Sequence, residues 1–191
     1  MKVLGINGSA RRNGNTAILL NKVFAELQQA GIETEMLQLG GEGIQGCMAC
    51  YGCVNSRDQK CVITEDIVNI SLQKMMAADG IILGSPTYFA DVTSDMKAFI
   101  DRVGFVSRAN GGLLKHKAGA AVVAVRRGGA LHAFDTMQHF LHISEMFLVG
   151  ANYWNFAYGR DIGEVEQDQE AMENMKVLGR NMAYLMQKLA K

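Results

Sequence analysis

Short apolar runs alternate with segments of helical period along the whole chain. The runs that we expect to form strands are residues 3–6, 33–39, 81–83, 120–125 and 149–154. The run at 33–39 alternates between apolar and polar positions, whereas 81–83 and 120–125 are continuously apolar, which is typical of strands covered on both faces. The pattern therefore predicts a sheet that lies between layers of helices.

Helical periodicity fills the gaps between these runs. One predicted helix carries an apolar stripe from Leu19 to Leu27 and ends near Gly31, and the others cover residues 66–77, 94–106, 130–147 and from about 165 onward. Because strands alternate with helices, the connections must cross over, so we expect a parallel sheet with helices on both faces. Many of the 12 methionines stand at helical spacing, which indicates core packing.

The composition is that of an ordinary globular chain, with 49% hydrophobic and 20% charged residues. A length of 191 residues suits one core, so we expect a single domain over residues 1–191 with a Cys-rich loop insertion at about 40–63. The 19 basic and 19 acidic residues cancel, and the chain has no basic run. Nucleic acid is therefore not an expected partner.

The first residues are apolar only briefly before the polar stretch at 7–16. This run is too short for a signal peptide or a membrane span, so we expect a cytoplasmic protein without a membrane partner. Thiols stay reduced in the cytoplasm, where clustered cysteines indicate metal or redox chemistry rather than disulfides.

The segment from Gly8 to Thr16 lies between the first predicted strand and the first helix, at the edge where doubly wound sheets bind ligands. Its glycines allow close approach, Ser9, Asn15 and Thr16 can donate hydrogen bonds, and a helix start favours anions. Arg11 or Arg12 can add charge. The segment is neither a Walker A loop nor the dinucleotide fingerprint. It predicts a phosphate site, and a polar turn that only caps a helix is the alternative.

Residues 85–89 follow the 81–83 run and include Pro86, the only proline, which stiffens the turn. Tyr88 and Phe89 can form one wall for a planar ring while Thr87 meets its polar edge. The alternative is that these aromatic side chains simply pack on a neighbouring helix.

Residues 126–129 follow the 120–125 run and bring Arg126, Arg127, Gly128 and Gly129 to the same edge. Cations and free amides suit an electron-rich ring such as reduced flavin. A solvated pair of arginines is the alternative, which we favour for at least one of them.

Together, these three segments resemble, in matching order, the FMN contact loops of the NADPH-dependent FMN reductase-like family of the flavodoxin-like superfamily. The resemblance implies a flavodoxin-like doubly wound α/β fold with a five-stranded parallel sheet of order 2-1-3-4-5. It implies the following FMN-binding residues: Ser9, Arg11, Asn13, Asn15 and Thr16 around the phosphate, Pro86, Thr87, Tyr88 and Phe89 along the isoalloxazine, and Arg126, Gly128 and Gly129 on its other side.

The same resemblance implies an NAD(P)H-dependent oxidoreductase. Electrons would pass from NADH or NADPH through FMN to a quinone, a flavin, another small acceptor or a redox protein. It also implies a homodimer or homotetramer with the flavin near the subunit interface. A non-catalytic electron carrier is the main alternative, although a net charge of zero argues against the acidic docking surface usual for carriers.

Gly40 to Ile63 lacks a clear period and contains all four cysteines, Cys47, Cys50, Cys53 and Cys61. Loops this long are usually functional. The compact spacing suits a [4Fe-4S] cluster and resembles the motif of the iron-sulfur flavoprotein branch of the same family. Zinc, or no metal at all, are the alternatives. We expect these ligands near the flavin, beside the carboxyl end of the second strand.

Two further patterns contain residue types that are capable of chemistry. His132, Asp135, His139 and His142 share roughly one side of a predicted helix, which indicates a solvated or subunit-facing side rather than a metal site. Cys50 lacks an assignable histidine base, so it is a poor candidate nucleophile. A structural zinc module would require the three loop resemblances to be coincidental.

Overall fold

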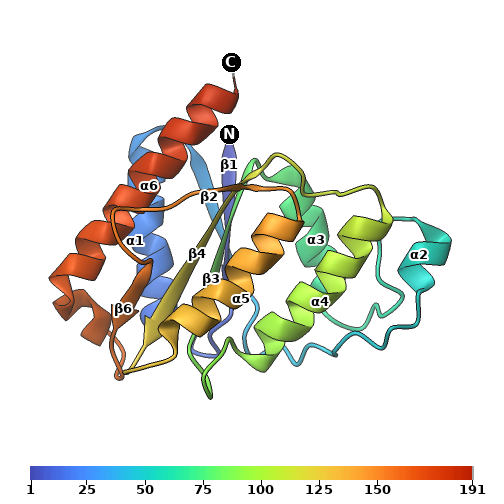
Figure 1. The fold of residues 1–191 in the computed structure, drawn as a ribbon, viewed down its shortest axis with the longest axis horizontal. Coiled ribbons are helices and arrows are strands. Elements are labelled where there is room, and N and C mark those ends of the chain that lie inside the picture. Colours follow the sequence, from blue (N-terminus) through green and yellow to red (C-terminus); the bar gives the residue numbers. More distant parts are fainter. Residues whose placement is uncertain (191) are drawn as a thin grey trace.

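A parallel sheet forms the centre of the computed structural model, which describes residues 1–190 (Figure 1). Its strands are β1 (Lys2–Asn7), β2 (Glu33–Gln38), β3 (Gly80–Pro86), β4 (Ala118–Val125), β5 (Phe147–Leu148) and β6 (Phe156–Tyr158). The order is β2-β1-β3-β4-β5, with β6 also paired to β4, and every pair is parallel. The predicted parallel sheet and its strand order are confirmed.

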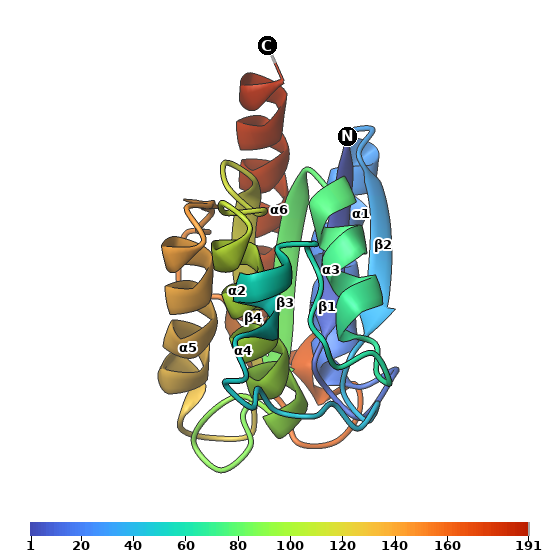
Figure 2. The ribbon, with the colours of Figure 1, turned by 90° about the vertical axis from the view of Figure 1, so that its right-hand side faces the viewer.

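Helices cover both faces of this sheet. They are α1 (Asn15–Gln29), α2 (Gly52–Ser56), α3 (Val68–Ala77), α4 (Ser94–Ala109), α5 (Ala130–Ile143) and α6 (Gln169–Leu189). Figures 1 and 2 show α1 and α6 on one face and α3, α4 and α5 on the other. The short helix α2 lies outside this arrangement, beyond α4. No helix in residues 1–190 has the length and apolar composition that crossing a membrane requires.

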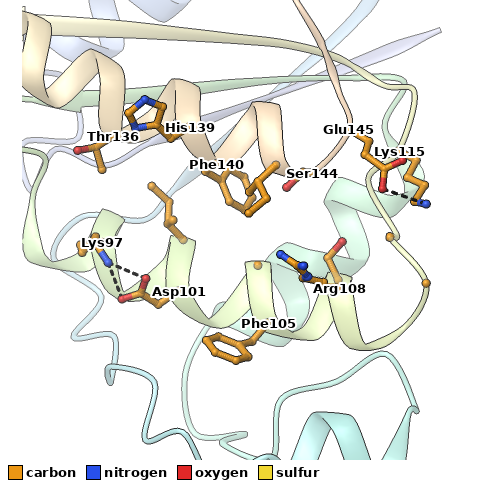
Figure 3. Close-up of a pocket in the computed structure, with 16 residues that line it drawn as sticks. Lys97, Asp101, Phe105, Arg108, Lys115, Thr136, His139, Phe140, Ser144 and Glu145 are labelled. Carbon is orange, nitrogen blue, oxygen red and sulfur yellow. Dashed lines mark hydrogen bonds and ion pairs between the residues drawn. The ribbon is translucent and has the colours of Figure 1, made fainter.

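A groove of about 940 Å³ runs along the surface between α4 and α5. Figure 3 shows Lys97, Asp101, Phe105 and Arg108 on one side and His139 and Phe140 on the other. Part of the predicted histidine side of α5 therefore borders a groove, through His139.

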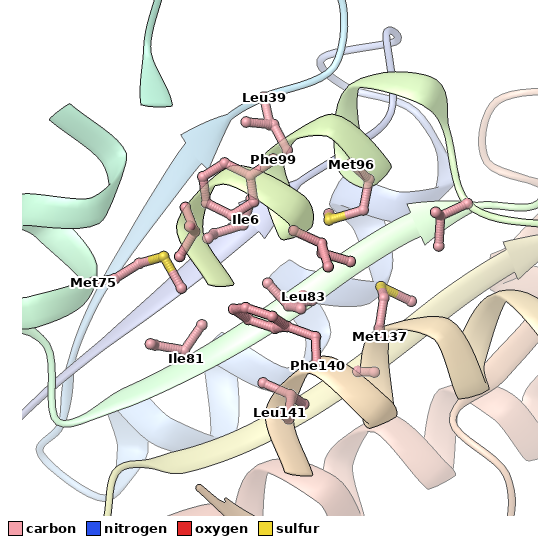
Figure 4. Packing of buried hydrophobic residues seen from close by; sticks show 14 of the residues in the cluster. Ile6, Leu39, Met75, Ile81, Leu83, Met96, Phe99, Met137, Phe140 and Leu141 are labelled. Atoms are coloured by element: carbon pink, nitrogen blue, oxygen red, sulfur yellow. The ribbon is translucent and has the colours of Figure 1, made fainter. Parts of the chain in front are cut away.

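The continuously apolar strands are buried on both faces, as their pattern predicts. Side chains alternate along a strand, so Ile81 and Leu83 of β3 pack toward α3, α4 and α5 while Ile82 packs toward α1 and α6. In Figure 4, Met96 and Met137 lie around Leu83 with Phe99 and Phe140. The methionines at helical spacing are core residues: Met75, Met96, Met137, Met175 and Met182 are fully buried.

The expected fifth strand at 149–154 is wrong, because two short strands, β5 and β6, flank that segment instead. Only its first residue still bonds to the sheet, since the Val149 N–H donates to the Gly119 carbonyl of β4 at 2.8 Å, whereas the backbone of Tyr153 and Trp154 bonds to Asn174 of α6. The Asn174 side chain accepts from the Tyr153 N–H at 3.1 Å and donates to the carbonyl oxygens of Tyr153 and Trp154 at 3.3 and 2.7 Å. The segment therefore loops away from the sheet between its two contacts with β4.

Two helix boundaries also differ from the expected ones. The helix predicted over 130–147 ends at Ile143, because Glu145 has a left-handed backbone conformation (φ 58°) and β5 follows directly. The helix expected from about 165 begins at Gln169, where the Asp168 side chain accepts a hydrogen bond from the Ala171 N–H. Residues 164–167 form a short 3₁₀ turn before it.

Ion pairs fix β2, which is an edge strand. Glu35 pairs with Lys2 of β1 at 2.8 Å and with Lys74 of α3, whereas Glu33 has a single, longer contact with Lys2 at 3.2 Å. Hydrogen bonds from Lys2 and Lys74 lower the pKa of Glu35 from its ordinary value of 4.5. The ionised carboxylate therefore stabilises the fold above about pH 4.5, and this contribution is lost as the pH falls through the lowered pKa.

We predict that Glu35→Gln lowers the free energy of unfolding by about 1 kcal/mol at pH 7, because two partly shielded ion pairs are lost. Urea unfolding measures this difference, which should shrink toward zero in acid, below the lowered pKa. Glu33→Gln is the matched control and should have a smaller effect, since that side chain is 69% exposed. Equal effects of the two substitutions at pH 7 would contradict the prediction.

Candidate functional site

Three loops meet at the carboxyl edge of the sheet, where β1, β3 and β4 end (Figure 1). The Gly8 N–H donates to the Gly84 carbonyl at 2.7 Å, and the Thr93 hydroxyl donates to the Gly8 carbonyl at 2.9 Å. The Thr87 N–H donates to the Ala124 carbonyl at 3.0 Å. The predicted convergence of the three segments on one edge is therefore confirmed.

The first loop leads into a helix start that has free hydrogen-bond donors. Gly14 stands at the N-cap of α1, so no side chain caps the helix, and its first turn contains no acidic residue. The Thr16 hydroxyl is buried and has no hydrogen-bond partner within residues 1–190. A buried polar atom without a partner is costly, so this position suits a ligand that would supply one. Free N–H groups at a helix start favour an anion.

The other polar side chains of this loop have more partners than the sequence indicates. The Asn15 amide donates to the Asp161 carbonyl and accepts from the Gly163 N–H, each at 2.9 Å. The buried Ser9 hydroxyl accepts from the Arg11 N–H at 3.2 Å. Asn15 thus links the loop to the segment after β6. Because these contacts use its side chain, only its backbone N–H is left for the predicted role in phosphate binding.

The arginines of the first loop are not equivalent. Arg12 pairs with the Glu42 carboxylate at 2.8 Å, whereas Arg11 donates only to the Arg160 carbonyl at 3.3 Å. Within the described residues, Arg11 has no carboxylate partner. Arg11 is therefore the better placed of the two to meet an anion. Asn13 is exposed beside it.

The second loop holds its aromatic residues in a tight turn. Tyr88 and Asp91 exchange backbone hydrogen bonds at 2.8 and 3.1 Å, and Phe89 between them has a left-handed backbone (φ 45°). The Phe89 side chain is fully exposed, so it does not pack on a neighbouring helix. A strained turn that presents an exposed aromatic ring is typical of a ligand-binding loop. The Thr87 hydroxyl is buried without a partner in the described chain, like that of Thr16.

The third loop approaches the second closely. A Cβ atom at Gly129 would lie 3.0 Å from Thr87 Cγ2, and Gly129 has φ 87°, so both space and conformation require glycine. Gly128 borders open space. Arg126 and Arg127 are exposed, and neither forms an ion pair within residues 1–190. Both cations are thus available at the edge of the site.

Sequence reasoning missed one segment of this site, the residues that follow β6. Gly159 packs against Asn15, and a cavity of about 550 Å³ beside Arg126 is lined by Tyr158, Gly159 and Arg160 among others. The Tyr-Gly-Arg sequence after an apolar run could have indicated it, since the third loop has a similar combination of glycine and arginine.

The four cysteines line a single pocket. Cys47 and Cys50 are exposed, and Cys53 and Cys61 are half-buried. Burial raises the pKa of the Cys53 thiol, and the neighbouring Cys61 raises that pKa further. The structure therefore gathers all four cysteines around one pocket beside α4.

The pocket has the donor set of a [4Fe-4S] or zinc site. Its present cavity of about 20 Å³ has room for about one water molecule. Within residues 1–190, no three His, Cys, Asp or Glu side chains stand in a metal-binding arrangement. The ligand types therefore fit a cluster, and the cysteine segment would have to open to take one.

The position of this pocket differs from the expected one. The Cys-rich segment, residues 40–63, starts at the three loops, where the Gly41 N–H donates to the Asp95 carboxylate at 2.7 Å. Its cysteines, however, pack against Arg102, Phe105 and Val106 of α4. Thr93 caps the start of α4 and bonds to Gly8 of the first loop, so it marks the position of the three loops. Arg102 lies nine residues further along this helix, which corresponds to about 14 Å. Within one chain, the cysteines are therefore not beside the predicted flavin site.

Comparisons with known proteins agree with this geometry. The family model for NADPH-dependent FMN reductase matches residues 1–161. An iron-sulfur flavoprotein of Methanocaldococcus jannaschii is 34% identical over 203 residues, covering 100% of both chains.

Two solved structures show the same fold. RosB, solved with 8-demethyl-8-formylriboflavin-5'-phosphate, has a TM-score of 0.78 at 20% identity and covers 100% of this chain and 80% of its own. A flavodoxin from the Archaea has a TM-score of 0.63 at 15% identity and covers 98% and 99%. This chain therefore belongs to the NADPH-dependent FMN reductase family, in its iron-sulfur flavoprotein branch, and has a flavodoxin-like fold.

Proposed function

We propose that this chain is an FMN-dependent oxidoreductase that passes electrons from NAD(P)H to a quinone, a flavin, another small acceptor or a redox protein. The observation that carries the proposal is the pair of buried threonine hydroxyls without partners, Thr16 and Thr87, on two of the three loops that meet at the sheet edge. Family membership supports FMN as the ligand that satisfies them.

The first loop would hold the phosphate of FMN. Phosphate oxygens accept hydrogen bonds only, so they match the uncapped N–H groups of α1 and the Thr16 hydroxyl. Arg11, which has no carboxylate partner in the described chain, would supply the neutralising charge.

The second and third loops would hold the isoalloxazine ring. Pro86 fixes the turn, and Tyr88 and Phe89 would cover the ring. Gly128 leaves space for it, and Gly129 lets the third loop lie close to Thr87. Bound FMN supplies the ability to take two electrons as hydride and release them singly or in pairs. Arg126 would favour negative charge on the ring through its own positive charge.

The four cysteines would hold a [4Fe-4S] cluster, which supplies one-electron steps when bound. The donor set in the pocket supports this, and so do relatives that are named iron-sulfur flavoproteins. Cys61 and Cys53 would be the more shielded ligands, and Cys47 and Cys50 the more accessible ones.

We also propose that the protein is cytoplasmic and forms a homodimer or homotetramer. The groove between α4 and α5, whose surface is mainly apolar, supports subunit contact (Figure 3). Sedimentation velocity of the purified chain tests the assembly, and a monomer at micromolar concentration would refute it.

We predict that Thr16→Val raises the dissociation constant of FMN about 10- to 100-fold, because a hydrogen bond to a charged group is worth about 1.5–3 kcal/mol. Fluorescence titration of the flavin-free chain measures this. The stability of the flavin-free chain should be unchanged or higher, since an unsatisfied hydroxyl is removed.

Riboflavin, which lacks the phosphate, provides the ligand control, and its affinity should not change. Thr34→Val is the matched protein control, because the Thr34 hydroxyl accepts from Gln28 away from the site. Equal losses for FMN and riboflavin would remove Thr16 from the phosphate site.

Reduced nicotinamide is expected to bleach the flavin absorbance under anaerobic conditions, and an added quinone is expected to restore it. Stopped-flow absorbance measures both half-reactions. A flavin that dithionite reduces, but that neither NADH nor NADPH reduces, would instead favour a non-catalytic electron carrier.

Protein purified anaerobically should contain about four iron and four sulfide per chain, and Cys50→Ser should lose them, because a bound cluster needs all four thiolates. Iron, zinc and sulfide analysis checks this. Finding zinc without iron would indicate a structural metal site, and flavin without either metal would indicate a flavin-only reductase.

A further inference from the structure

Arg102 of α4 is buried at the wall of the cysteine pocket. It is 1% exposed and is among the largest fully buried side chains. It is also the one charged side chain that lines this pocket in the described chain. Burying an arginine is costly unless every donor finds a partner, so its contacts indicate what the cation does there.

The guanidinium joins both ends of the cysteine segment. Its Nη1 donates to the Gln45 carbonyl at 3.2 Å, just before the first cysteine, and also pairs with the Asp66 carboxylate. Its Nη2 donates to the Ile63 carbonyl at 2.9 Å, just after the last cysteine. One side chain from α4 thus holds together residues that are about twenty positions apart in sequence.

The third nitrogen of the guanidinium is directed at a sulfur atom. Nε donates to Cys61 Sγ at 3.3 Å. The backbone of Cys61 is fixed as well, because Asn69 of α3 accepts from its N–H at 2.8 Å and donates to its carbonyl at 2.9 Å. Cys61 is therefore held by two helices, whereas Cys47 and Cys50 lie exposed on the loop.

We propose that Arg102 is a positioning residue for the cluster, and that its N–H···S hydrogen bond to Cys61 raises the reduction potential of the cluster. This inference rests on the proposed [4Fe-4S] site. Reduction adds negative charge to a cluster and its thiolates, and hydrogen bonds to sulfur and nearby cations stabilise that charge. Asp66 opposes the effect with its own negative charge, but it contacts Nη1 rather than the sulfur.

Three variants test the proposal. Arg102→Met with Asp66→Asn removes the sulfur contact without leaving a buried carboxylate unpaired. Asp66→Asn alone keeps the sulfur contact and removes the opposing charge. Lys188→Met is the control, because Lys188 is an exposed cation that lines neither the cysteine pocket nor the groove between α4 and α5.

The readout is a redox titration of anaerobically purified holoprotein. The electron paramagnetic resonance signal of the reduced cluster measures the fraction that is reduced at each potential. Compared with Asp66→Asn alone, the double variant should shift the ratio of reduced to oxidised cluster at least about tenfold toward the oxidised form at a fixed potential, which is about 59 mV for one electron. Compared with the wild type, Asp66→Asn should shift the ratio toward the reduced form, and Lys188→Met should leave it unchanged. If Arg102 were purely structural, the double variant and Asp66→Asn alone would have the same potential.

Each outcome decides the proposal. A double variant with full iron and the same potential as Asp66→Asn alone would overturn it. If that variant loses its iron, hydrogen exchange over residues 45–66 is compared between the metal-free variant and the metal-free wild type. Faster exchange in the variant supports positioning by Arg102, and equal exchange overturns it. Wild-type protein without iron would refute the proposed cluster itself, and with it this inference, before any variant is compared.

Discussion

Both faces of a parallel sheet must be covered for the sheet to be stable, and in this chain the requirement is strictest at β4, where all eight residues are buried. Helices can cover both faces only if the chain crosses over after each strand, so the loops after β1, β3 and β4 all leave at one edge. The site at that edge is thus a result of packing, and the loop residues alone decide its chemistry.

The same packing explains what could be predicted from sequence. Residues 81–83 and 120–125 could be assigned to strands because burial on two faces makes the sequence continuously apolar. The convergence of the Thr16, Thr87 and Gly129 loops followed from strand order, since parallel strands share a carboxyl edge. The expected strand at 149–154 does not form because the backbone of Tyr153 and Trp154 bonds to the side chain of Asn174, which lies about twenty residues further along the chain. A local pattern contains no signal for such a partner.

Long-range contacts also limited the prediction of the site. Asn15 has a residue type suited to phosphate, but its amide binds the chain at Asp161 and Gly163, about 146 residues further on. The cysteine motif was visible from its spacing, yet its position along α4 depends on Arg102, which in the sequence is one charged residue on an amphipathic helix. Residue types thus indicated chemistry, whereas the packing of other elements decided which atoms remain free for it.

The loop fixed by Asn174 has an optical consequence. Trp154 is the only tryptophan in the chain, and its carbonyl is held by Asn174 while its ring meets Phe134 of α5 edge-on, with ring centroids 6.3 Å apart. Its emission therefore comes from one defined place, against α5, whose N-cap is Gly129 of the third loop. Flavins absorb where tryptophan emits, so quenching of this single fluorophore offers a label-free signal of ligand arrival at the sheet edge.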